Sequence, residues 1–153
     1  MSIRVQNGSA LIEAMVAVLV FSFGILALIS MQTAAIRSTA DAKYRADASF
    51  LANQIIGQMW GEAPASLVTY VNGSSATAVG ATLCPIGGAA ATAPAAITWL
   101  TEIAKLLPGA DANRQQVTVA GDVVTVRLCW LDKSTTAGVY HNHVISAQIN
   151  KNL

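Results

Sequence analysis

The pattern of apolar residues divides the chain into an uninterrupted apolar run, an amphipathic helical stretch and a C-terminal stretch with alternating residues. Residues 14–31 carry no charged side chain. At about 1.5 Å per residue they form roughly 27 Å of helix, enough to cross most of a hydrocarbon core. In the amphipathic stretch that follows this run, apolar residues recur at steps of three and four. They are Ala40, Tyr44, Ala48, Leu51, Ile55 and Met59. The pattern predicts one helix over residues 9–60, whose second half needs a covering layer.

The C-terminal third changes to a period of two, which predicts strands. Gln115–Ala120 and Val123–Leu131 flank Gly121-Asp122, a tight-turn pair, and therefore predict a hairpin. Residues 135–138 form a second loop, and Val139–Ile149 supplies a last strand. On the middle strand one face is apolar: Val124, Val126, Leu128 and Trp130. An antiparallel sheet of this size needs cover on one face. We therefore predict an α+β fold in which the second half of the long helix packs on a small antiparallel sheet.

The region between helix and sheet, residues 63–93, is rich in small residues. Leu67–Val71 fits a short helix or a strand, and periodicity does not choose between them. Asn72-Gly73 is a turn signal, and we interpret Asn72-Gly73-Ser74 as this turn although it also matches the N-glycosylation pattern. A short helix is expected to begin at Pro94, with Thr92 as a candidate cap, and to end before Pro108-Gly109. Its inward face is predicted to hold Ala96, Leu100, Ile103 and Leu107, with Trp99 as a packing residue.

Length and charge limit the possible functions. The 153 residues allow one domain besides the apolar helix, and the net charge of +1 provides no basic field for nucleic acid. No catalytic triad order, phosphate-binding glycine loop or pair of catalytic carboxylates occurs, so we expect neither an enzyme nor a cofactor. His141 and His143 would share a strand face. Without a third ligand nearby in the sequence, we interpret them as residues of an exposed strand edge rather than a metal site.

Glu13 is the single ionisable residue between residues 10 and 31. A carboxylate in a membrane helix is costly and marks a functional site by default. A cleaved secretory signal fits poorly, because its apolar core is shorter, about 7–15 residues, and ends in a small-residue cleavage site. A plain membrane anchor stays open, but it does not explain the acid.

The order of a short polar leader, Gly8, small or apolar residues, Glu13 and a long apolar helix resembles the class III signal of type IV prepilins and pseudopilins. The first 60 residues more narrowly resemble the PilV-type minor pilins. The matching positions are Leu11-Ile12-Glu13, Gly24-Ile25-Leu26, Leu28, Met31-Gln32, Ile36-Arg37, Arg45, Ala48, Leu51-Ala52 and Met59. Two positions depart from the family pattern: Ser9 stands where an aromatic residue is usual, and Ser30 stands where major pilins usually have a proline.

The resemblance implies a sequence of events. A prepilin peptidase would cleave between Gly8 and Ser9 in the cytoplasm and methylate the new amine of Ser9. Glu13 would then pair with such an amine during assembly with other minor and major pilins. Residues 1–8 would be the leader, residues 9–31 the transmembrane and assembly half of the helix, and residues 32–153 the periplasmic domain. The protein would span the inner membrane once, with its N-terminus in the cytoplasm, before it enters an extracellular pilus.

Cys84 and Cys129 are the only cysteines. In a periplasmic domain an even number favours a disulfide that ties the small-residue loop to the sheet, while two separate buried thiols are the alternative.

Two further functions stay open at this point. One is a minor pseudopilin of a type II secretion system, and the other is a monomeric, membrane-anchored periplasmic domain that binds a ligand through its loops.

Overall fold

The computed structural model describes residues 7–73, 84, 86–132 and 138–149. The chain divides into two compact units, Met1–Asp41 and Ala42–Leu153, which are described separately below. The predicted leader therefore lies outside the described residues except for its last two, and most of the predicted loop 135–138 lies outside them as well.

The first unit contains the N-terminal part of helix α1, which runs from Asn7 to Trp60. The helix predicted over residues 9–60 is confirmed. Side chains from Ser9 to Thr39 are all exposed, and an 18-residue window of this helix reaches a mean hydropathy of 2.5. Among the described residues, α1 is the one helix that is long and apolar enough to cross a membrane.

The hydroxyl groups within the apolar run are satisfied by the helix itself. Ser22 Oγ donates to the Val18 carbonyl at 2.7 Å, and Ser30 Oγ donates to the Leu26 carbonyl at 3.1 Å. Each bond joins residues four apart, so it forms without any partner from outside the helix. These serines therefore present little unsatisfied polarity to an apolar environment.

The second unit contains a three-stranded antiparallel sheet in the order β1-β2-β3. The strands are β1 (Gln116–Ala120), β2 (Val123–Asp132) and β3 (Val139–Gln148). The predicted hairpin is confirmed, since Ala120 pairs with Val123 across Gly121-Asp122. Gly121 has φ +60°, a backbone conformation that glycine adopts without the steric cost of a Cβ. The predicted third strand is confirmed as well.

Helix α2 (Pro94–Leu106) begins at the predicted proline. The prediction that Thr92 caps this helix is wrong. The N-cap residue is Ala93, which makes no side-chain capping bond. The fixed φ of Pro94 suffices to start the helix. Leu67–Val71, for which the sequence allowed either a short helix or a strand, lies in a 3₁₀ helix, η1 (Pro64–Tyr70), and its C-cap Val71. A second 3₁₀ helix, η2 (Ala112–Arg114), precedes β1.

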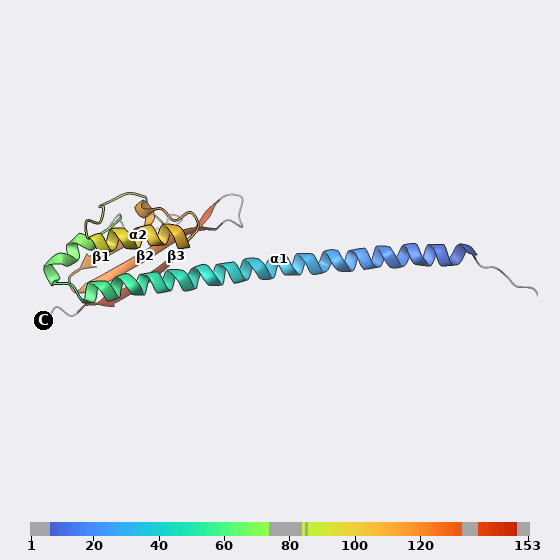
Figure 1. Cartoon of the computed structure of the whole chain (residues 1–153), viewed down its shortest axis with the longest axis horizontal. Helices are drawn as coiled ribbons and strands as arrows, with labels where there is room; N and C mark the ends of the chain where they lie inside the picture. Colours follow the sequence, from blue (N-terminus) through green and yellow to red (C-terminus); the bar gives the residue numbers. More distant parts are fainter. Residues whose placement is uncertain (1–6, 74–83, 85, 133–137, 150–153) are drawn as a thin grey trace, which may run out of the picture. The chain divides into compact units, whose positions relative to one another are not determined.

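The core of the second unit lies between the sheet and the two helices, which Figure 1 shows running across the sheet. The predicted helix stripe is confirmed, with Ala48, Leu51, Ile55 and Met59 fully buried. The predicted inward faces of α2 and β2 are buried too. Trp99 packs in this core at 1% exposure, and its Nε1 donates to the Leu51 carbonyl at 2.8 Å. The fold is thus α+β, with a long N-terminal helix and a small antiparallel sheet in a pilin-like layout.

Candidate functional site

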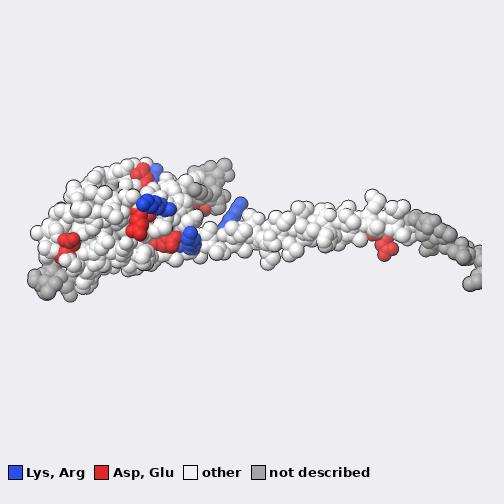
Figure 2. Space-filling model, in the orientation of Figure 1, with Lys and Arg blue, Asp and Glu red and all other residues white. Residues whose placement is uncertain are grey.

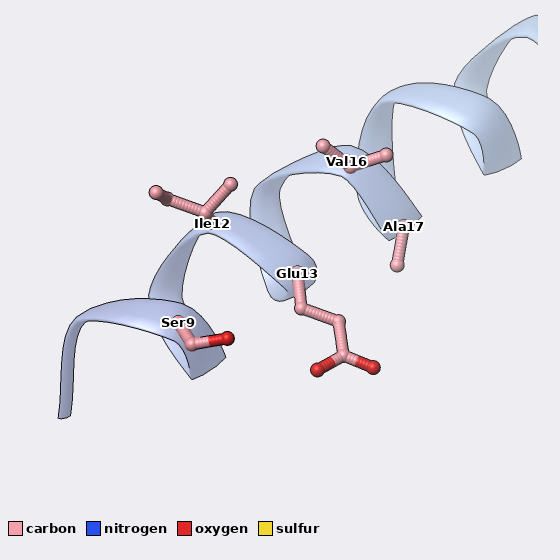
Figure 3. A pocket seen from close by; sticks show the side chains of 5 residues that line it. All are labelled: Ser9, Ile12, Glu13, Val16 and Ala17. Carbon is pink, nitrogen blue, oxygen red and sulfur yellow. The ribbon is translucent and has the colours of Figure 1, made fainter. Parts of the chain in front are cut away.

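Ser9 and Glu13 lie one helical turn apart on α1, and Figure 3 shows their side chains on the same side of the helix. Ile12, Val16 and Ala17 complete a shallow, open surface around them. All five residues are exposed and come from a single helix, so the surface is a contact patch rather than an enclosed pocket. It combines one carboxylate with an otherwise apolar surround.

Glu13 has no hydrogen bond or ion pair to any residue that the structure describes. In water, the lack of a protein partner costs the Glu13 carboxylate no free energy. An isolated carboxylate in an apolar environment is strongly unfavourable and requires a cation or a hydrogen-bond donor. A partner for Glu13 must therefore come from outside the described part of this chain, or from a newly formed chain terminus.

Gly8 and Ser9 both belong to the first turn of α1, which begins at Asn7. The first N–H groups of a helix have no intrahelical partner, and the positive end of the helix dipole lies there. A chain that began at Ser9 would add an α-amino group to this positive end. Its charge would lie about one turn from the Glu13 carboxylate, so the local arrangement suits a pairing of the two.

The apolar surface around Glu13 is extensive. Most large apolar side chains between residues 11 and 36 are more than half exposed: Leu11, Ile12, Met15, Val16, Val18, Leu19, Val20, Phe21, Phe23, Leu26, Leu28, Ile29, Met31 and Ile36. Figure 2 shows a surface almost without charge along this part of the helix. Such a surface is stable in lipid or against other apolar helices.

The predicted disulfide between Cys84 and Cys129 is present, with an S–S distance of 2.08 Å and a Cα–Cα distance of 5.9 Å. The alternative of two separate thiols is therefore wrong. Arg114 secures the same loop, because its Nη1 donates to the Cys84 carbonyl at 3.1 Å while its guanidinium lies 4.1 Å from the centroid of the Tyr140 ring. Cys84 is thus held by one covalent bond to β2 and by one hydrogen bond from a cationic side chain.

Asn72, predicted to lie in a turn, instead extends the sheet. It forms an isolated bridge with Val117, and Gly73 forms one with Ala89. The buried Asn72 amide donates to the Ala112 and Gln115 carbonyls and accepts from the Ala91 N–H. Sequence reasoning missed this role, because the Asn-Gly pair signals a local turn and gives no information about partners some 40 residues away.

His141 and His143 lie on β3, an edge strand as predicted, but both are half-buried. His141 Nε2 is 3.3 Å from Asp132 Oδ2, and its ring stacks on Trp130 at a centroid distance of 6.0 Å. Within the described part of the chain, no three His, Cys, Asp or Glu residues group closely enough to hold a metal ion. The geometry gives His141 a packing role.

Comparison with known proteins adds no assignment: no protein-family model, curated protein or solved structure matches this chain.

Proposed function

We propose that the chain is a PilV-type minor pilin, which is incorporated into type IV pili or primes their assembly. The observation that carries this proposal is the carboxylate of Glu13, which has no partner among the described residues and lies near the start of a long apolar helix with an exposed N-terminal half. The second unit, with its α+β layout and its disulfide, supports the same assignment.

In this proposal a prepilin peptidase removes residues 1–8 on the cytoplasmic side and methylates the amine of Ser9. The helix then holds the protein in the inner membrane as a single span, with residues 32–153 in the periplasm. The resemblance to minor pilins also connects the protein with twitching motility and adhesion.

Glu13 sets the register of assembly. The Ser9 amine is a cation at the edge of an apolar helix, and it needs an anionic partner once it leaves water. The Glu13 carboxylate, on the same subunit or on the preceding one, supplies that partner. Insertion among the helices of other pilins pairs both charges and buries the apolar surface as the subunit leaves the lipid.

The test compares Glu13→Gln, which removes the charge at constant size, with Ser22→Ala, which changes another polar residue of the same helix. Each full-length variant is quantified in sheared surface filaments and in inner membranes, and the N-terminus is identified by mass spectrometry. We expect filaments to contain chains that begin at methylated Ser9. Glu13→Gln should lower the filament fraction at least tenfold while membrane levels persist, and Ser22→Ala should match wild type.

Two results would contradict the proposal. One is normal entry of Glu13→Gln chains into filaments, which removes the register role of the acid. The other is recovery of uncleaved Met1 chains in the membrane alone, which would favour the anchored ligand-binding domain.

A further inference from the structure

Asn72 is followed by Gly73, and an asparagine that precedes a glycine can modify itself without an enzyme. The backbone nitrogen of the glycine attacks the side-chain amide carbon of the asparagine, ammonia leaves, and a succinimide ring forms. Water then opens the ring at either carbonyl, which leaves aspartate or isoaspartate. Glycine favours the attack, because it has no Cβ to hinder its nitrogen and its backbone turns freely. The sequence therefore supplies both reacting groups at this position.

The nucleophile of this reaction is held away from its target in the folded chain. The Gly73 nitrogen donates to the Ala89 carbonyl at 2.8 Å, and the Ala89 nitrogen donates to the Gly73 carbonyl at 3.1 Å. Attack requires the Gly73 nitrogen to lose its proton, whereas a hydrogen bond donated by the N–H stabilises the protonated form. The same bond fixes the direction of the nitrogen. The Gly73–Ala89 pair must therefore open before the attack.

The side-chain amide that would be attacked is held by three hydrogen bonds. Asn72 is only 5% exposed. Its Nδ2 donates to the carbonyls of Ala112 and Gln115 at 2.9 and 2.7 Å, and its Oδ1 accepts from the Ala91 nitrogen at 3.2 Å. Ring closure would turn the amide toward the Gly73 nitrogen and break these bonds. The freed polar groups would then be buried without partners, which is unfavourable.

Neither product of the reaction fits the folded site. Aspartate keeps the length of the main chain, but its carboxylate has no N–H to donate to the two carbonyls that Asn72 Nδ2 contacts. Isoaspartate adds a methylene group to the main chain between positions 72 and 73. That insertion lies between two backbone bridges, Asn72 with Val117 and Gly73 with Ala89, and it disturbs their registers relative to each other. A chain that has reacted therefore cannot restore this site.

We propose that Asn72-Gly73 is a self-modification site that records the folding state of the second unit. The folded unit keeps the pair unreactive, and release of the segment from Val117 and Ala89 lets it react irreversibly. One asparagine and one water give one aspartate or isoaspartate and one ammonia, so the step needs no oxidant, reductant or cofactor. The product carries one additional negative charge. This inference goes beyond the proposed function and does not depend on it, because it uses residues of the second unit alone.

The reaction is measured on the full chain in detergent micelles with the disulfide intact, in mildly alkaline buffer. One sample is folded, and the other contains enough urea to unfold the second unit. Peptide mapping by mass spectrometry gives the fraction of Asn72 converted. We expect conversion to be at least tenfold slower in the folded sample, because the native segment opens only rarely. Equal rates in the two samples, or no conversion in urea, would each overturn the proposal.

A matched pair of variants tests the backbone pair that holds the nucleophile. Residue 89 is exposed, and Ala89→Pro removes the N–H that bonds to the Gly73 carbonyl, whereas Ala89→Val keeps it. We expect Ala89→Pro to speed the conversion of Asn72 at least tenfold without urea, and Ala89→Val to match wild type. Conversion in Ala89→Pro as slow as in wild type would overturn the proposal.

Thermal unfolding shows whether the second unit of Ala89→Pro remains folded. If it does not, the wild-type chain at increasing urea concentrations replaces this variant. Conversion of Asn72 should then rise in step with the fraction of unfolded molecules, and a rate independent of urea would overturn the proposal.

The irreversibility of the modification is tested by refolding. Chains converted in urea are separated from unconverted chains by isoelectric focusing, since they differ by one charge, and the urea is then removed from both. We expect the converted chains to melt at a lower temperature than the unconverted ones, and Asn72→Asp, which is the aspartate product made by mutation, to melt lower as well. Recovery of the wild-type melting temperature by the converted chains would overturn the irreversible record.

Discussion

The side chain of Gln115 pairs with the backbone of Cys129 in the way that a neighbouring strand residue would. Its Oε1 accepts from the Cys129 N–H at 2.8 Å, and its Nε2 donates to the Cys129 carbonyl at 3.1 Å. Gln115 is fully buried, just before β1 begins at Gln116. The amide thus continues the β1–β2 ladder past the end of β1, next to the disulfide.

Replacing Gln115 by methionine should lower the free energy of unfolding by about 2–4 kcal/mol. The substitution keeps the size of the side chain but removes its two buried hydrogen bonds to the backbone of Cys129. Urea unfolding of the full chain in micelles, followed by tryptophan fluorescence with the disulfide intact, measures the loss. Gln58→Met, on an exposed position of α1, is the control and should change stability by less than about 0.5 kcal/mol. Equal effects of the two substitutions would contradict the role of Gln115.

Trp99→Phe should cost about 2–3 kcal/mol, whereas Trp60→Phe should cost less than about 0.5 kcal/mol. Trp99 is 1% exposed and donates to the Leu51 carbonyl, while Trp60 is 51% exposed. The first substitution loses a buried hydrogen bond and leaves a void between α2 and the packed part of α1. Thermal unfolding of the two variants side by side distinguishes them, and similar melting temperatures would refute the assigned contact.

Gly73→Ala and Gly57→Ala should change stability in opposite directions. Gly73 has φ +77°, and a Cβ there would lie 2.5 Å from the Gln115 carbonyl oxygen. The added methyl group meets both backbone strain and a clash, so we expect a loss of at least about 2 kcal/mol. At Gly57, in α1, a Cβ meets open space, and alanine should add up to about 1 kcal/mol through helix propensity. Denaturant midpoints of the two variants check both signs.

Stability should fall at alkaline pH in a way that depends on Tyr70. Burial, followed by the hydrogen bond from its hydroxyl to Glu62 Oε1 at 2.9 Å and the charge of that carboxylate, raises the pKa of Tyr70 above 10.0. The folded state therefore holds the phenolic proton more tightly than the unfolded state does. The resulting stability is fully present below pH 10 and is lost as the pH rises from there through the folded-state pKa.

The measurement is the free energy of unfolding between pH 8 and pH 11 for wild type and Tyr70→Phe. We expect the alkaline decline to be shallower in Tyr70→Phe, because that chain has no phenol to ionise at this position. Glu62→Gln should make the decline smaller and end it at a lower pH, since removing the nearby negative charge lowers the folded-state pKa of Tyr70 toward its unfolded value. An unchanged pH profile in Tyr70→Phe would show that the decline has another source.

The apolar framework of the fold follows from local patterns in the sequence. A run of apolar residues followed by apolar steps of three and four is satisfied by one long helix, and alternation around Gly121-Asp122 is satisfied by one hairpin. Burial of Leu51 and Ile55, or of Val124 and Val126, requires only that each element present its apolar face to any apolar layer. The single acid at Glu13 and the pair of cysteines were recognisable for the same reason, because each stands out against its own surroundings.

Polar groups in the second unit depend on the tertiary structure instead. Gln115 and Asn72 are buried because segments distant in the sequence bring backbone groups to their amides, and no local pattern contains that information. The same holds for the edge of the sheet: alternation makes three strands, but only the tertiary structure places Asn72 beside Val117 at the outer edge of β1. Hydrophobic burial is non-directional and can be read along the chain, whereas a hydrogen bond needs a partner at a defined place, which the folded chain alone provides.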